Sequence, residues 1–171
     1  MMRSVRGFTL IELMVTIGVM AIIAVIAVPS FNSMLLKQNL NASTRSLVIT
    51  LEKARSKAAL ERRPVDVNLD PSNLLDPSAP EEKVDPLTKN YTIYWKPSGK
   101  ATLISTTKLI TFRADGMVQD PITPTIPLSS DLTLVLCDNA QADAKYSKKI
   151  IISRMGTVQQ GELVSGSCNA S

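Results

Sequence analysis

The chain contains no histidine among its 171 residues. This absence excludes Ser-His-Asp and Cys-His catalysis, zinc sites with histidine ligands and an imidazole pH switch. Two cysteines are too few for a zinc site with four thiolate ligands. The seven glycines form neither of the glycine-rich motifs that bind nucleotide phosphates. We therefore expect no catalytic residue, no metal site and no cofactor, and we expect that the protein is not an enzyme.

The net charge of +4 is concentrated in one segment of the chain. Residues 37–63 hold seven Lys and Arg against two Glu, whereas residues 64–171 hold ten Lys and Arg against twelve Asp and Glu. The C-terminal two-thirds is thus slightly acidic. The basic excess therefore lies on residues 37–63, and its placement matters more for nucleic-acid binding than the size of the net charge.

The longest apolar run extends from Phe8 to Val28 and has Glu12 as its only charged residue. As a helix it would be about 31 Å long, enough to cross the apolar part of a bilayer. Arg3 and Arg6 precede it, and the positive-inside rule then places the N-terminus in the cytoplasm. A cleaved secretory signal peptide and a simple signal anchor are alternatives. Neither explains Glu12, because a carboxylate in apolar surroundings is costly unless it is paired.

The segment Arg6-Gly7-Phe8-Thr9-Leu10-Ile11-Glu12-Leu13-Met14 resembles the leader junction and mature start of type IV pilins. The resemblance implies that residues 1–7 are a leader, which prepilin peptidase removes between Gly7 and Phe8. It also implies methylation of the new amine of Phe8. Residues 8–30 would span the bacterial inner membrane before assembly and would later lie in the core of the fibre.

Two further residues have roles that this resemblance suggests. Glu12 would pair with the Phe8 amine of a neighbouring subunit, which removes the cost of two unpaired charges in an apolar fibre core. Recruitment to the assembly platform in the membrane is the competing role for Glu12. Pro29 stands where pilins place a helix-kinking proline, and its missing N–H should bend or locally melt the helix.

Beyond Pro29 the pattern predicts that the helix continues to residue 62, where Pro64 ends it. Residues 31–63 form an amphipathic continuation with one apolar stripe. The stripe consists of Leu40, Leu47, Val48, Leu51, Ala54 and Ala58. The basic residues lie largely off the stripe: Lys37, Arg45, Lys53, Arg55, Lys57, Arg62 and Arg63. We favour a solvated face that lines contacts with neighbouring subunits over a surface for DNA or anionic lipid.

After Pro64 the apolar period changes from helical to alternating, and residues 64–171 are predicted to form a head domain outside the cytoplasm. The expected strands are residues 65–69, 91–95, 101–106, 109–113, 117–119, 132–137, 149–154 and 157–159. No helical pattern separates them, which indicates antiparallel sheets or a small sandwich, and the fold class is α+β. Residues 70–90 are expected to be a loop rich in proline and acid, and whether it binds a cation stays open.

The cysteines and aromatic residues of the head domain have structural interpretations. Cys137 and Cys168 are the only cysteines, and outside the cytoplasm a disulfide is the simplest expectation. It would tie the tail, residues 161–171, to the strand that ends at Cys137. A redox-active pair is the rival, but the C-x-x-C spacing is absent. The aromatic residues are expected in the core and hairpins rather than on a base-stacking surface: Tyr91, Tyr94, Trp95 and Phe112.

Two segments of the head domain narrow the resemblance. Residues 110–116 and 150–156 are hydrophobic strands that each end at a turn glycine, and they resemble two paired segments of the FimT/FimU/GspH family. The resemblance implies a minor pilin or minor pseudopilin with a long helix packed on antiparallel sheets. Such subunits belong to a tip complex that primes fibre assembly.

Three roles compete within this family. A FimU-like subunit joins other minor pilins at the tip and links them to the major pilin, which supports twitching motility, adhesion or DNA uptake. A FimT-like subunit binds DNA in natural transformation, and a GspH-like subunit belongs to the type II secretion pseudopilus. DNA-binding members carry arginines after the last turn glycine, whereas this chain has Gly156-Thr157-Val158-Gln159. The remaining candidate DNA contacts are Lys145, Lys148, Lys149 and Arg154. We therefore expect the FimU-like role, with prepilin peptidase, the assembly platform and other pilins as partners.

Overall fold

The structure is a computed structural model that describes residues 8–70, 82–84, 91–105, 107–120, 126–166 and 168. For residues 26–30, 83 and 141 it describes the backbone alone. The chain divides into two units, one that ends at Leu35 and one that begins at Leu36. The predicted leader, with Gly7, lies outside the described residues.

Helix α1 extends from Leu10 to Glu61 and begins at a cap. The hydroxyl of Thr9 accepts a hydrogen bond from the N–H of Glu12 over 3.3 Å. This side chain satisfies one of the amides that the first helical turn leaves free, as threonine does at many helix starts. The helix therefore begins two residues later than expected. It is helical through position 29, and a bend at Pro29 stays a prediction.

The C-terminal end of α1 confirms the expected stop before Pro64. Arg62 has a left-handed backbone with φ of 52°. The N–H of Arg63 donates to the carbonyl of Ala58 over 3.3 Å. A left-handed residue with a bond back across the last turn is a common helix terminus. The proline that follows cannot continue the helix.

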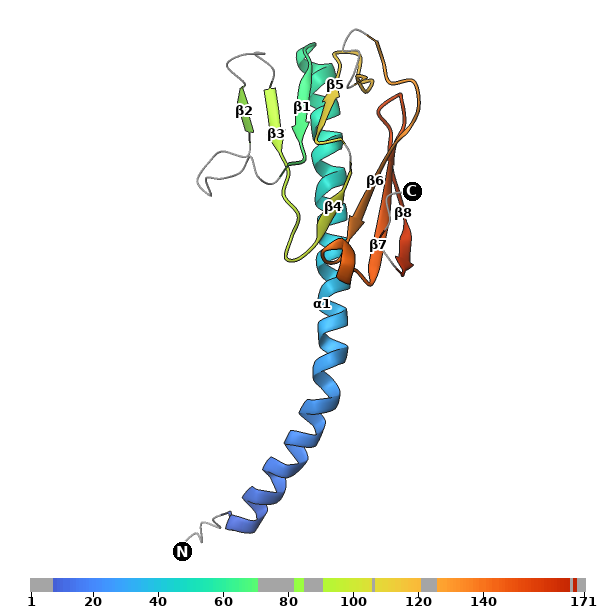
Figure 1. Ribbon diagram of the computed structural model, residues 1–171. Helices are drawn as coiled ribbons and strands as arrows, with labels where there is room; N and C mark the ends of the chain where they lie inside the picture. Colours follow the sequence, from blue (N-terminus) through green and yellow to red (C-terminus); the bar gives the residue numbers. More distant parts are fainter. Residues whose placement is uncertain are drawn as a thin grey trace, which may run out of the picture. The chain divides into compact units, whose positions relative to one another are not determined.

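Two four-stranded sheets pack against the second half of the helix (Figure 1). The first sheet has the order β2-β3-β1-β5, and the second has the order β4-β6-β7-β8. The strands of the first sheet are β1 (Val65–Asn68), β2 (Glu82–Val84), β3 (Tyr91–Tyr94) and β5 (Leu109–Phe112). Those of the second are β4 (Thr102–Ile104), β6 (Leu132–Cys137), β7 (Tyr146–Ile152) and β8 (Val158–Ser165). The α+β class with a helix on antiparallel sheets is confirmed.

One pairing departs from the antiparallel expectation, because β1 and β3 run parallel. Residues 69–90 connect them, a segment long enough for the chain to return to the end at which β1 begins. That connection also contains β2, which pairs with β3. The expectation of a loop over residues 70–90 is therefore wrong at β2.

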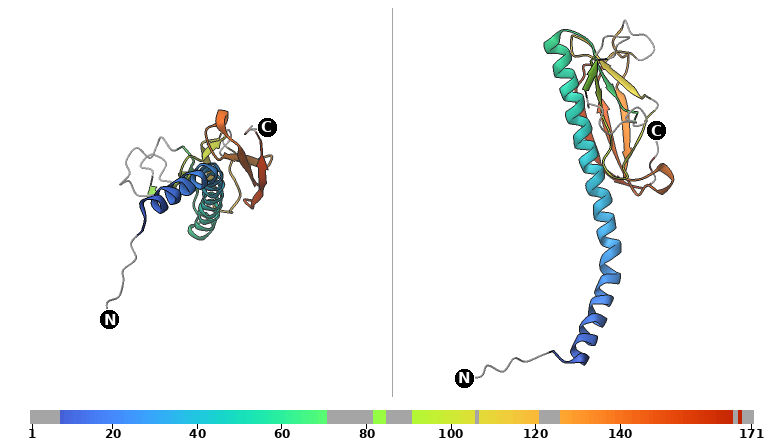
Figure 2. Two further views of the ribbon diagram at one scale, coloured as in Figure 1. Left: turned by 90° about the horizontal axis from the view of Figure 1, so that it is seen from below. Right: turned by 90° about the vertical axis from the view of Figure 1, so that its left-hand side faces the viewer.

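Helix and sheets share one core (Figure 2). Every residue of the predicted helix stripe is buried, and Leu40, Leu47 and Leu51 are fully so. They pack with residues of both sheets, among them Phe112 of β5 and Ile150 of β7. The expected core roles of Trp95 and Phe112 are confirmed by their burial.

The last hairpin differs most from the expectation. Strand β7 begins at Tyr146 rather than at residue 149, and β8 extends to Ser165. Residues 161–165, which were expected to belong to the tail, are therefore part of a sheet. Most of β8 is exposed, so burial imposes no alternation on its sequence, and no pattern could reveal its length.

Candidate functional site

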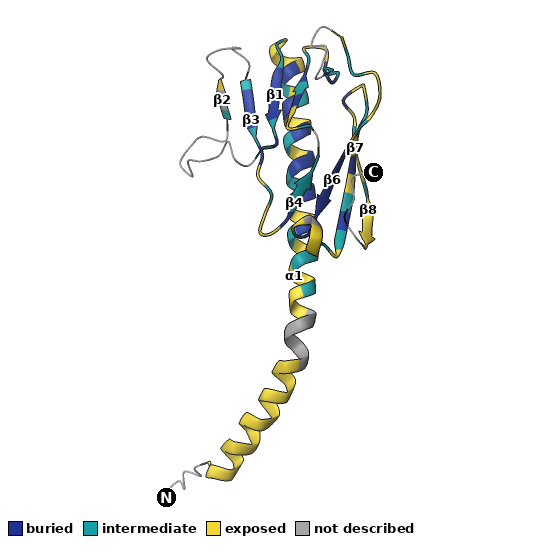
Figure 3. Ribbon diagram, viewed as in Figure 1, coloured by how far each residue is buried: buried dark blue, intermediate teal, exposed yellow. Residues whose placement is uncertain are grey.

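The most unusual surface of the first unit is its apolar helix. Every side chain from Phe8 to Val25 is exposed, as the uniform colour of this segment in Figure 3 shows. Phe8 is 82% exposed and Leu10 77%. Soluble proteins rarely expose contiguous apolar surface of this kind, and such surfaces mark contacts with other proteins or with lipid.

Glu12 lies in the first turn of this exposed helix. An acidic side chain there is stabilised by the positive end of the helix dipole. Its own amide is bonded to the Thr9 hydroxyl, and Phe8 immediately precedes that cap. The spacing Thr-x-x-Glu is the sequence signature of such a cap, a signal that the sequence analysis did not use. Phe8 and Glu12 thus lie on either side of the Thr9 cap, at the very start of the helix.

Within the described ranges, none of the helices combines the length and the hydropathy of a membrane-spanning segment.

Part of the basic face of α1 is solvated, since Arg45, Lys53 and Arg62 are exposed, but three of its lysines also contact the head domain. Lys53 and Lys57 form ion pairs with Glu82 of β2. The ammonium of Lys57 also lies 3.4 Å from the centre of the Tyr91 ring, a cation–π contact. The ammonium of Lys37 lies 4.5 Å from the ring of Tyr146. These three cations contact the head domain within the same chain, and contacts of the basic face with neighbouring subunits stay a prediction.

The structure does not bring the candidate DNA contacts together. Lys145 precedes β7 and Arg154 follows it, so the seven-residue strand separates them by about 25–30 Å. Lys148 and Lys149 are adjacent in β7, opposite Leu136 and Val135 of β6. Adjacent strand residues project to opposite faces of a sheet. No single surface therefore presents all four cations.

Cys137 and Cys168 form a disulfide with their Cα atoms 6.0 Å apart. Both residues are fully buried and pack with Val135 in a small cluster beside the main core. The bond joins the end of β6 to the chain just beyond β8. Its burial makes it a structural cross-link rather than an exposed redox pair.

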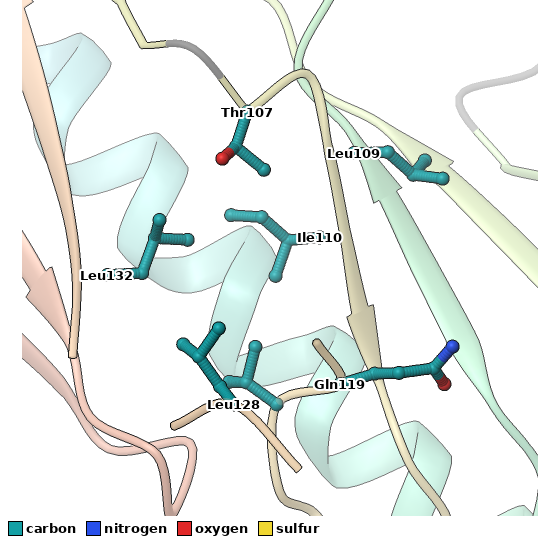
Figure 4. A pocket seen from close by; sticks show the side chains of 7 residues that line it. Thr107, Leu109, Ile110, Gln119, Leu128 and Leu132 are labelled. Atoms are coloured by element: carbon teal, nitrogen blue, oxygen red, sulfur yellow. The ribbon is translucent and has the colours of Figure 1, made fainter. Parts of the chain in front are cut away.

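Two pockets of the head domain have mainly apolar linings. The pocket of Figure 4 is enclosed mainly by aliphatic side chains from β5, β6 and their connection. Its lining residues are Thr107, Leu109, Ile110, Val118, Gln119, Leu128 and Leu132. A second hollow of about 260 Å³ has Leu69, Pro97, Ala101, Thr102 and Leu103 around it. The hydroxyl of Thr102 donates to the Asn139 carbonyl. Among the described side chains, no three carboxylates or cysteines gather into a possible metal site.

Two protein-family models match the sequence of this chain. A prokaryotic N-terminal methylation motif matches residues 2–28. The family described as type II transport protein GspH matches residues 43–156, about two-thirds of the chain. No match was found among curated proteins.

Two solved structures are similar, and both are crystal forms of the type IV minor pilin FimU of Pseudomonas aeruginosa. The first is 20% identical, covers 74% of this chain and 90% of its own, and has a TM-score of 0.49. The second is also 20% identical, covers 72% of this chain and 93% of its own, and has a TM-score of 0.47.

Proposed function

Because the chain belongs to the GspH family, a family of pilin-like subunits, we propose that it acts as a minor type IV pilin in the priming complex at a pilus tip. There it would link other minor pilins to the major pilin. The observation that carries this proposal is the exposed apolar helix, residues 8–25, with Glu12 in its first turn. Apolar surface of this extent is stable only when it is buried, and parallel helices of neighbouring subunits would bury it.

The proposed maturation begins with prepilin peptidase, which cuts between Gly7 and Phe8. The methylation motif matched over residues 2–28 supports this site. The new amine would belong to Phe8, would be methylated, and would lie just before the cap at Thr9. The chain would then consist of the apolar helix 8–30, its amphipathic continuation 31–63 and the head domain 64–171.

Before assembly, residues 8–30 would hold the subunit in the bacterial inner membrane with its N-terminus in the cytoplasm. The apolar run from Phe8 to Val28 and the preceding Arg3 and Arg6 support this orientation. During transfer to the fibre, Glu12 would pair with the Phe8 amine of a neighbouring subunit. Pairing removes the cost of two isolated charges and fixes the stagger between helices. Pro29 would allow the helix to bend as it packs.

The test compares Glu12→Ala with Glu52→Ala, which removes another exposed glutamate from the same helix. We expect Glu12→Ala to be processed normally and to fall at least about tenfold in sheared fibres, because an unpaired amine would remain in the apolar core. Glu52→Ala should be incorporated at the normal level. Normal amounts of the Glu12→Ala protein in the fibres would refute the pairing and, with it, the proposed assembly role.

A minor pseudopilin of type II secretion is the second candidate, and the description of the family favours it. Both roles use the same N-terminal chemistry, so the Glu12 test does not separate them. Deletion of the gene does. Loss of surface pili with normal protein secretion would support the pilus role, and the reverse result would support the pseudopilus role.

A further inference from the structure

Strand β8 is the open edge of the second sheet. It has eight residues, Val158 to Ser165, and is the longest strand of the protein within the described residues. It pairs with β7 on one side, and the order β4-β6-β7-β8 leaves its other side at the sheet margin. In such a strand about half of the backbone N–H and C=O groups point away from the sheet. These groups can pair with another strand.

The other three sheet edges are short or covered. Strands β2 and β4 have three residues each, and β2 is pinned to α1 through Glu82. The free side of β5 is covered at Thr111 and Phe112 by the segment Met117–Gln119. There the N–H of Gln119 donates to the carbonyl of Thr111 over 2.9 Å. Natural proteins protect sheet edges in these ways and with β-bulges. Strand β8 has a register shift opposite Lys149, but among the described residues it is the long edge strand that no other segment covers.

The sequence of β8 has few of the residues that block edge pairing. It contains no proline, lysine or arginine, and Glu162 is its only charge. Leu163 and Val164 are 38% and 52% exposed. As neighbours in a strand they project to opposite faces, so apolar surface is available above and below the edge. A strand added beside β8 would cover part of both.

From these observations we propose that β8 binds an extended strand from the head domain of a different pilin subunit. The partner strand would lie about 4.8 Å from β8 and would continue the second sheet. Backbone hydrogen bonds would supply affinity, and apolar side chains of the partner would contact Leu163 and Val164. This inference rests on the proposed function, because it takes its partner from the same fibre.

The direction of β8 argues against a second copy of this chain. Figure 1 shows β8 running opposite to the segment of α1 that packs on the sheets. Two copies that paired their β8 strands about a two-fold axis would have antiparallel strands and therefore antiparallel helices. Subunits in one membrane or one fibre have parallel helices. The partner strand must then come from another element of another subunit.

Charge beside the edge indicates the composition of the partner. The neighbouring strand β7 carries Lys148 and Lys149, the latter exposed, and β8 itself carries only Glu162. Cations therefore outnumber anions along this hairpin. A partner strand with acidic residues would be complementary.

The first experiment places the photo-crosslinking residue p-benzoylphenylalanine at position 164 of the full chain, in cells that assemble pili. The matched control places it at position 109, since Leu109 is an apolar residue of the other sheet and is 46% exposed. We expect an adduct from position 164 whose cross-linked peptide maps to a head-domain strand of another pilin, and no such adduct from position 109. An adduct with β8 of a second copy, an adduct with another subunit's N-terminal helix, equal adducts from both positions, or none from position 164 would each overturn the proposal.

The second experiment compares Val164→Lys with Leu109→Lys. A lysine at position 164 would face the apolar side chains of the partner, whereas one at position 109, in the other sheet, stays in solvent. We expect Val164→Lys to reduce incorporation into fibres about tenfold, equivalent to about 1.4 kcal/mol, and Leu109→Lys to leave it unchanged. Equal incorporation of the two variants would contradict the edge as a binding site.

Failure of this inference is distinguishable from failure of the proposed function. If Glu12→Ala abolishes incorporation and Val164→Lys does not, the subunit is a pilin whose β8 has no partner. If neither variant affects incorporation, the proposed function itself is refuted.

Discussion

The Nε of Arg55 on α1 donates a hydrogen bond to the carbonyl oxygen of Gly116 over 3.2 Å. Gly116 and Gly156 close two turns with the same left-handed backbone, each with φ of 77°. A Cβ on Gly156 would lie 2.3 Å from that same carbonyl oxygen. One turn follows β5 and the other joins β7 to β8, so the two sheets meet over a single arginine of the helix.

We expect Gly156→Ala to be far more destabilising than Gly116→Ala. Both alanines would carry the left-handed backbone, which costs roughly 1–2 kcal/mol. Only the alanine at position 156 would also collide with a backbone oxygen, whereas the nearest neighbour at position 116 lies 3.5 Å away. The total loss for Gly156→Ala should exceed about 3 kcal/mol, measured by urea unfolding of the unit Leu36–Ser171, which contains the head domain and the helix segment of its core. Equal losses for the two variants would show that the turns are further apart than described.

Arg55→Ala should lower the free energy of unfolding by about 1–2 kcal/mol, because the Gly116 carbonyl loses its donor and the aliphatic stem loses its packing. Arg45→Ala provides the control, since Arg45 is an exposed arginine on the same helix. Its effect should stay within about 0.5 kcal/mol. Comparable losses from both substitutions would indicate that helix charge, rather than this contact, matters.

Removal of the disulfide in the double variant Cys137→Ala/Cys168→Ala should cost about 3.5–4 kcal/mol, because the bond closes a loop over a separation of 31 residues. The melting temperature should fall on the order of 10 °C. Treatment of the unaltered protein with a thiol reductant under denaturing conditions should give the same lowered value after refolding. A melting temperature that stays constant would argue against the cross-link.

Duplex DNA should not bind specifically to the fragment of residues 36–171 at physiological salt. Counterion release needs several cations on one surface, and Lys145, Lys148, Lys149 and Arg154 are dispersed along and across β7. The measurement is a titration with a short duplex at low and at physiological salt. Saturable binding that is lost when Lys148, Lys149 and Arg154 are neutralised would instead support a DNA receptor.

Much of the helix could be predicted from the sequence, because its burial follows a strict period. Leu47, Leu51 and Ala58 recur on one face, and all are buried. The same period could not reveal Ser43, a fully buried serine whose hydroxyl accepts the N–H of Ser98 over 2.8 Å. Polar side chains that satisfy a loop backbone carry no periodic signal.

The strands were predictable where one face is buried and uncertain elsewhere. Strand β6 begins and ends at the expected residues, Leu132 and Cys137. Strands β2 and β8 lie at sheet edges, and the pairing that defines them comes from the neighbouring strand rather than from their own sequence. The contacts of the basic residues of α1 could not be predicted either. Lys57 contacts Glu82 and Tyr91, which are distant in the sequence and come close only in the folded chain.

The buried cross-link between Cys137 and Cys168 makes a covalent ring of the end of β6, all of β7 and all of β8. Mechanical load applied to β8 would act in shear along its hydrogen bonds with β7, and the ring would pass that load directly to β6 in the middle of the sheet. Peeling of the edge strand would therefore stop at the cross-link, and the head domain would resist extension as one body.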